Sequence, residues 1–140
     1  MVKRSERGFS IIELVLVVVV IGIIATIAIP FLAAAVRSAE NGNTFATMRT
    51  IASTEVNYYQ QNSRFGRITE INNVMAGSIG TQSGNTVTRG KFNLAMTPAA
   101  PSDAELKTAY IITATRNVPS EGVIYVYEIT QTGWIRQILP

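Results

Sequence analysis

The chain has 140 residues, which is enough for one domain plus an attached segment. It contains no cysteine and no histidine, which excludes disulfide bridges, thiolate chemistry and the commonest general base. The formal net charge is +3, but most of it comes from the first eight residues, which hold three basic side chains and one acidic side chain. The remainder is nearly neutral, and this argues against a generally basic protein that seeks nucleic acid.

A long apolar run follows the basic N-terminus. Residues 14–36 carry no charge, and as a helix they would extend about 35 Å, enough to span a bilayer. Three basic residues precede the run and only Arg37 follows closely, so the positive-inside rule predicts a cytoplasmic N-terminus. A secretory signal peptide is the alternative. It is disfavoured because the run is longer than the roughly 7–15 apolar residues of such peptides.

One carboxylate, Glu13, lies at the start of this run. An acid at the centre of a membrane helix costs about 2.5–3.5 kcal/mol, so its presence needs either a functional reason or a route to the aqueous interface. In the intact chain Glu13 lies close enough to Arg7 to reach that interface. If the chain is cut between Gly8 and Phe9, the new amine and the carboxylate both lie in apolar surroundings, and each needs a counter-charge.

The stretch RGFSIIELVLVVVVIGIIATIAIP resembles the N-terminal signature of type IV pilins and type II secretion pseudopilins. In that family a short basic leader ending in glycine precedes a phenylalanine, a small hydroxyl residue, a glutamate and a long apolar helix with a glycine and a proline. A serine here replaces the more usual threonine, and the matching positions are Gly8, Phe9, Ser10, Glu13, Gly22 and Pro30.

The resemblance implies processing followed by assembly. A prepilin peptidase would remove a leader of residues 1–8 by cutting after Gly8, and it would methylate the amine of Phe9. The transmembrane or filament-core helix would comprise residues 9–37. Glu13 would pair with the Phe9 amine of a neighbouring subunit in a filament.

Two residues weaken the apolar helix. Pro30 has no N–H to donate to the carbonyl of Thr26, and Gly22 lowers helix propensity relative to alanine. Membrane helices tolerate a single proline kink. The resemblance adds a second expectation, that this section unwinds in the polymer.

Beyond Arg37 the pattern becomes amphipathic and predicts a helix that ends near Asn62. Arg49 and Glu55 lie off the apolar stripe. The segment 41–43, Asn-Gly-Asn, predicts a break or a flexible joint. The stripe itself, at spacings of three or four residues, is formed by Phe45, Met48, Ala52, Val56 and Tyr59.

The remaining chain reads as loop followed by sheet. Residues 63–90 are rich in Gly, Asn, Thr and Ser and predict a connecting loop with one short helical turn near residues 69–75. Three or four strands are expected within residues 91–140, at 91–97, 109–116, 123–130 and 134–138. The predicted fold is therefore α+β. A long N-terminal helix, membrane-spanning in its first half, packs its amphipathic second half on a small antiparallel sheet, together forming a globular part of residues 38–140.

Three other kinds of site are disfavoured. An enzyme on a membrane tether, or a Ca²⁺ site, would have to use isolated acids such as Asp103 and Glu105, and no phosphate loop or nucleophile elbow supports it. A DNA-binding patch would combine cations with aromatic side chains, but ordinary loop charge explains the same residues. Those residues are Arg64, Arg67, Arg89 and Lys91 with Phe65 and Phe92.

The sequence thus predicts a structural subunit of a type IV pilus-like filament, with no enzymatic activity, cofactor or metal. Its expected partners are copies of itself, a prepilin peptidase, an inner-membrane assembly platform and membrane lipid. It would be a single-pass inner-membrane protein before assembly, and part of an extracellular pilus or a periplasm-spanning filament afterwards. The alternative is a pseudopilin or minor pilin of a type II secretion or DNA-uptake machine. The sequence does not distinguish these roles, nor adhesion from motility.

Overall fold

The structure is a computed structural model that describes residues 8–139. The chain divides into two compact units, Met1–Ala39 and Glu40–Pro140. Helix α1 (Ile11–Asn62) supplies the described helical residues of the first unit and continues into the second. The second unit, called the head below, contains the sheet and all of the buried core.

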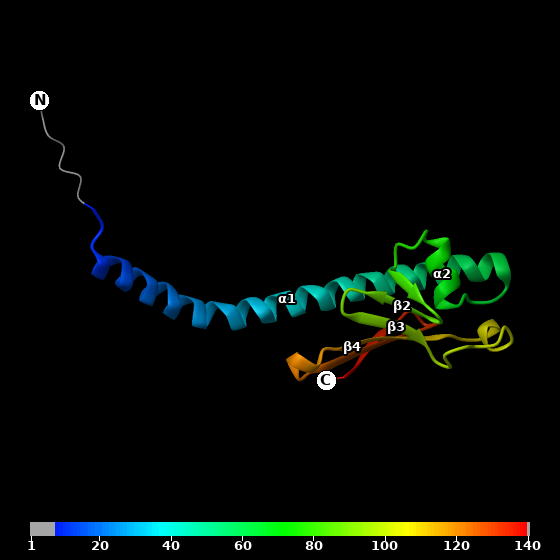
Figure 1. Cartoon of the computed structure of the whole chain (residues 1–140). Coiled ribbons are helices and arrows are strands. Elements are labelled where there is room, and N and C mark those ends of the chain that lie inside the picture. The colour runs from blue at the N-terminus through cyan, green and yellow to red at the C-terminus, as the bar shows by residue number, and fades with distance from the viewer. Residues whose placement is uncertain (1–7, 140) are drawn as a thin grey trace, which may run out of the picture. The chain divides into compact units, whose positions relative to one another are not determined.

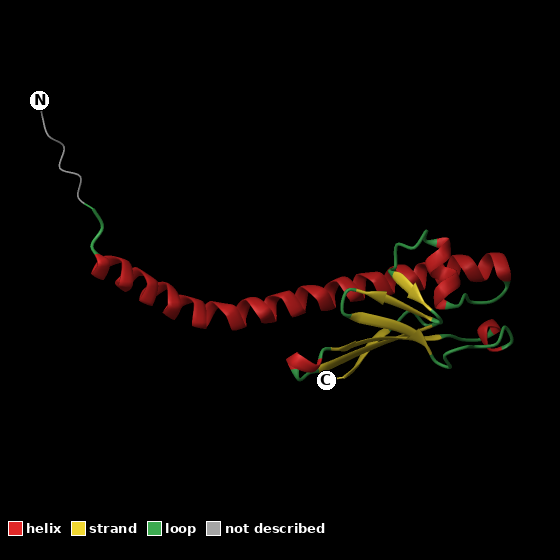
Figure 2. Ribbon diagram, in the orientation of Figure 1, coloured by secondary structure: helices red, strands yellow, loops and turns green. Residues whose placement is uncertain are grey.

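The head is an antiparallel meander packed on the second half of α1, with the short helix α2 beside it (Figures 1 and 2). All six strands follow one another across the sheet in chain order. Two single 3₁₀ turns, η1 (Glu105–Lys107) and η2 (Pro119–Glu121), lie before and after the fourth strand. The remaining elements are α2 (Ile68–Val74), β1 (Thr81–Ser83), β2 (Thr86–Arg89), β3 (Phe92–Met96), β4 (Ile111–Asn117), β5 (Ile124–Thr130) and β6 (Ile135–Leu139).

The core forms because alternate residues of each strand point to the same face. In β3 and β4 the registered pairs Leu94↔Ala114 and Met96↔Ile112 place apolar side chains opposite one another, and all four are buried. Met48 and Ile51 of α1 and Ile68 and Ile71 of α2 close over this face. Burying these side chains removes apolar surface from water, which is the main term that holds the helix on the sheet.

The predicted α+β architecture is confirmed, but the strand count of three or four is too low. The region expected to be loop holds α2, close to the expected turn, and also the hairpin β1–β2. These strands are only three and four residues long and join through Gly84, whose φ of +57° suits glycine. Such short, Thr-rich strands around a glycine turn have nearly the composition of a loop, which explains why the pattern hid them.

Helix α1 ends at Asn62, as predicted, and runs without a break through residues 41–43, where a joint was expected. Its buried face is rotated from the predicted stripe: Val56 is 51% and Tyr59 39% exposed, whereas Glu55, predicted to lie off the stripe, is fully buried. Threonines are buried on this face because their hydroxyls donate to helix carbonyls four residues back, Thr44 to Glu40 at 3.0 Å and Thr47 to Asn43 at 2.9 Å.

Candidate functional site

Three of the predicted site residues, Gly8, Phe9 and Glu13, lie at or just before the start of α1. Phe9 is 80% exposed, and a side chain added at Gly8 would meet nothing within 4 Å. The backbone N–H of Ser10 donates to Glu13 Oε2 at 3.2 Å, and the carbonyl of Ser10 accepts the N–H of Leu14 at 3.2 Å. Glu13 thus caps the first turn of the helix, where a negative charge also favours the helix dipole. The rest of the predicted leader, residues 1–7, lies outside the described residues.

The apolar run that follows has no protein cover in the structure. The side chains of residues 14–36 are exposed apart from Ala25, which is half-buried, and none in the most apolar 18-residue stretch is buried. By length and composition this part of α1 is sufficient to cross a membrane. Gly22 and Pro30 both lie within continuous helix, so the weak section between them is helical here.

A cluster of charges at the beginning of the head was not predicted. The guanidinium of Arg116 in β4 is fully buried and binds Glu40 of α1 at 2.8 Å and the carboxylate of Glu121 in η2. Lys91 binds Glu121 at 3.1 Å. The two carboxylates, with Glu121 the stronger influence, raise the pKa of Arg116. The sequence does carry one signal of this buried arginine. The alternation Ile112, Ala114, Arg116 along β4 puts Arg116 at a core position.

The residues considered above for a DNA-binding patch form contacts within the head. Arg64 binds Glu70 at 2.7 Å, and its hydrogen bond is the main reason that the pKa of Glu70 falls to about 2. Arg67 binds Asp103 at 2.6 Å, and Arg89 donates to the carbonyl of Ser78 at 2.8 Å. The aromatics face inward: Phe92 is buried, and Phe65 packs on the rings of Tyr59 and Tyr110. The cations are therefore paired within the head, and the two aromatic rings are not presented for stacking on bases.

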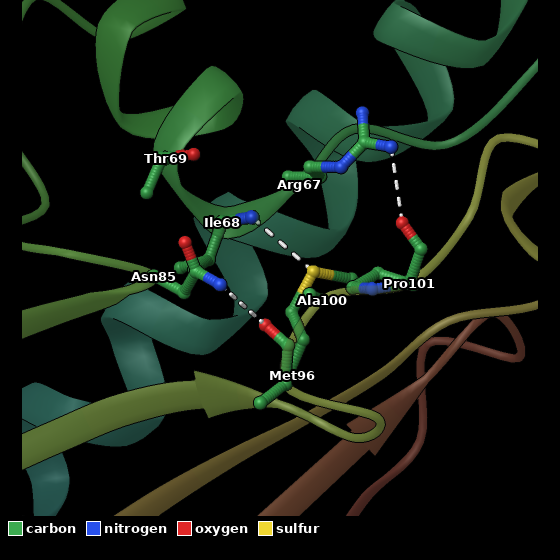
Figure 3. Close-up of a pocket in the computed structure, with 8 residues that line it drawn as sticks. Arg67, Ile68, Thr69, Asn85, Met96, Ala100 and Pro101 are labelled. Carbon is green, nitrogen blue, oxygen red and sulfur yellow. Dashed lines mark hydrogen bonds between the residues drawn. The ribbon is translucent and has the colours of Figure 1, made fainter.

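A cavity of about 110 Å³ lies where α2 begins, beside the loop after β3 (Figure 3). Its polar groups bind one another: Arg67 donates to the carbonyl of Pro101 at 3.0 Å, and the N–H of Ile68 points at the sulfur of Met96 at 3.3 Å. Within residues 8–139 no group of three or more Asp, Glu, His or Cys side chains is placed to hold a metal ion. The cavity is thus a gap between α2 and the loop after β3, and these two hydrogen bonds hold the segments around it together.

The arrangement at the start of α1 has a counterpart in other proteins. Residues 3–29 match the family model for the prokaryotic N-terminal methylation motif. This is the prepilin signature of type IV pilins and pseudopilins. Comparisons with curated proteins and with solved structures gave no match.

The prepilin signature supports a pilin-like or pseudopilin subunit, and it points to a structural role for the chain. It implies processing by a prepilin peptidase and assembly into a pilus-type fibre. Together with the apolar part of α1, it is consistent with a membrane-anchored precursor. The signature contains Gly8, Phe9, Glu13 and Gly22, and it ends just before Pro30.

Proposed function

We propose that this chain is a structural subunit of a type IV pilus-like filament, with no catalytic activity and no cofactor. One observation carries the proposal: the prepilin signature is coupled to a helix whose apolar side chains have no cover. A helix that is apolar all round is stable only inside a larger core or a membrane. Lipid would provide that environment for the precursor in the inner membrane, and the apolar helices of other subunits would provide it in the filament.

In this proposal the residues at the start of α1 have separate roles. Gly8 and Phe9 form the cleavage site, and the freed amine of Phe9 becomes methylated. Glu13 then pairs with the Phe9 amine of a neighbouring subunit and sets the register between the two. The leader is residues 1–8 and the filament-core helix residues 9–37. Exposure of Phe9 and the empty space around Gly8 support access by a peptidase.

Processing is the most direct test of this proposal. Mass spectrometry of protein from the native membrane should find an N-terminus at methylated Phe9. Gly8→Arg should remain at the precursor mass, because a large charged side chain replaces the one residue that leaves the scissile backbone unobstructed. Ser10→Thr, which restores the usual residue of the family, is the control and should be cut normally. A mature N-terminus at Ala35 or later would indicate an ordinary signal peptide and refute the assignment.

A pseudopilin or minor pilin of a type II secretion or DNA-uptake machine is the second candidate, because the prepilin signature is common to both classes. The two differ in where the processed chain accumulates. Electron microscopy of fibres sheared from the cell surface should show this chain as the main component if it is a major pilin. If it is detected only in the cell envelope, the second candidate is favoured.

A further inference from the structure

Four exposed apolar side chains of the head gather at one end of the β5–β6 hairpin. Val123, Ile124, Ile138 and Leu139 are 36%, 43%, 47% and 47% exposed, and we call them the Ile124 patch. The start of β5 lies beside the end of β6, because Val126 is registered with Leu139. Exposed apolar groups in a cluster, unlike single ones, indicate an interaction surface.

The Ile124 patch lies at the end of the sheet that is joined to Glu40. Asn117 of β4 is registered with Ile124, and its neighbour Arg116 binds Glu40 at 2.8 Å. The same end carries Lys91, whose side chain is 44% exposed. The patch and the first residue of the head are therefore held together by the strand register and one buried ion pair.

Chain length limits how far this end of the head can lie from a membrane. The charge-free run ends at Val36, four residues before Glu40. Even fully extended, four residues reach only about 14 Å. The headgroup layer on each side of a bilayer is roughly 5–8 Å thick. Whatever the angle between the two units, Glu40 stays close to the lipid surface if residues 14–36 span the bilayer.

We propose that the Ile124 patch is a membrane-contact surface that rests in the headgroup region of the bilayer on the side where the head emerges. The proposal rests on the proposed membrane anchoring of residues 14–36. Lipid is the favoured occupant over a second copy of the chain, because the distance limit applies to each subunit before any assembly. From the headgroup layer, the apolar side chains of the patch would reach the acyl boundary. This contact would orient the head before the subunit enters a filament.

Single-cysteine labelling of the full chain tests the contact, since the chain has no cysteine of its own. Ile138→Cys and Ile124→Cys would each carry an environment-sensitive fluorophore, NBD, in vesicles of phosphatidylethanolamine and phosphatidylglycerol with and without nitroxide-labelled lipid. Val74→Cys is the matched control: Val74 is apolar and 60% exposed, and it borders a groove with Gln61, about 30 Å along α1 from Glu40. Ile21→Cys reports whether the span itself is in lipid.

Emission from the two patch labels should shift to the blue, and nitroxide lipid should quench it, while the Val74 label stays unquenched. Patch labels that behave like the Val74 label, with the Ile21 label quenched, would overturn the patch proposal and leave the membrane anchor intact. An unquenched Ile21 label would instead refute the anchor, and with it the proposed function. A blue shift without lipid quenching that grows with the protein-to-lipid ratio would show that a second copy covers the patch, which also overturns lipid contact.

Discussion

The carboxyl group of Glu55 lies in the interior of the head, where ionising it costs free energy. It is fully buried on α1; Oε2 accepts the N–H of Gly66 at 2.7 Å, and Oε1 has no hydrogen-bond partner among the described residues. Burial is the main cause that raises its pKa to about 8, with Glu70 adding to the rise, while the Gly66 hydrogen bond and Arg64 oppose it. Tyr110 is also buried nearby, and its own pKa is raised chiefly by burial. At neutral pH Glu55 is therefore mainly the uncharged acid.

This burial makes the stability of the head depend on pH. The unfolded chain releases the Glu55 proton near 4.5, whereas the folded head holds it until about pH 8. The neutral Glu55 side chain therefore makes its full contribution to the free energy of unfolding below pH 4.5. This contribution is lost as the pH rises toward 8, and the free energy of unfolding falls by at most about 1.4 kcal/mol per pH unit. Glu55→Gln keeps the acceptor for Gly66 and cannot ionise. Urea unfolding at pH 6 and pH 8.5 should show a smaller loss of stability for the variant, and equal losses would contradict the buried-acid assignment.

Arg116 gives a second prediction at this scale. Its guanidinium is fully buried, so Arg116→Met would leave Glu40 and Glu121 with Lys91, a half-exposed side chain 3.8 Å and 3.1 Å from them, as their shared cation. We expect a loss of about 1.5–3 kcal/mol in the free energy of unfolding, because hydrogen bonds to charged groups are lost while Lys91 still compensates the two carboxylates. Arg136→Met is the matched control: Arg136 pairs with Glu128, but its side chain is 67% exposed, and such pairs contribute only about 0–1 kcal/mol. Similar losses in the two variants would show that the buried cluster is not a special stabilising feature.

At the scale of elements, contiguous patterns were predictable and long-range pairings were not. The signature at residues 3–29 and the strands β3–β6 are readable because each depends on neighbouring residues in the chain. The rotated face of α1 was missed because Thr44 and Glu55 are polar by identity and are buried only through specific hydrogen bonds. The ion pair of Glu40 with Arg116 joins residues 76 positions apart, so only the fold could reveal it.

The packing of α1 on the sheet predicts an independent head. Removing residues 1–36 deletes the charge-free run but keeps Glu40, Met48 and the rest of the core. The fragment should be a soluble, folded monomer, because Met48 and Ile51 of α1 remain buried in the core of the head. Circular dichroism, a cooperative urea transition and analytical ultracentrifugation would measure this. An unfolded or aggregated fragment would contradict the helix-on-sheet packing.

At the scale of the whole molecule, the apolar helices of neighbouring subunits need something that sets their register. Within residues 14–36 of the sequence, Thr26 is the only residue whose side chain can form a hydrogen bond, and it already donates to the carbonyl of Ile23 at 2.7 Å. When such helices associate in an apolar environment, packing alone therefore specifies their register only weakly. A charge that must be paired supplies the missing register, because a one-turn slip leaves it unpaired at a cost of several kcal/mol.

Glu13 allows that register role to be separated from its local role as a helix cap. In the structure its carboxylate accepts the N–H of Ser10, a contact that glutamine can also make and valine cannot. Loss of a cap costs only about 0.5–2 kcal/mol. If Glu13 merely caps α1, Glu13→Gln should form filaments normally; if it pairs with the Phe9 amine of a neighbour, Glu13→Gln and Glu13→Val should both insert and be cut at Gly8, yet give few or no fibres. We expect the second result, measured as the yield of sheared fibres alongside the mass of the processed subunit. A normal fibre yield from the Glu13→Val subunit alone would eliminate the docking role.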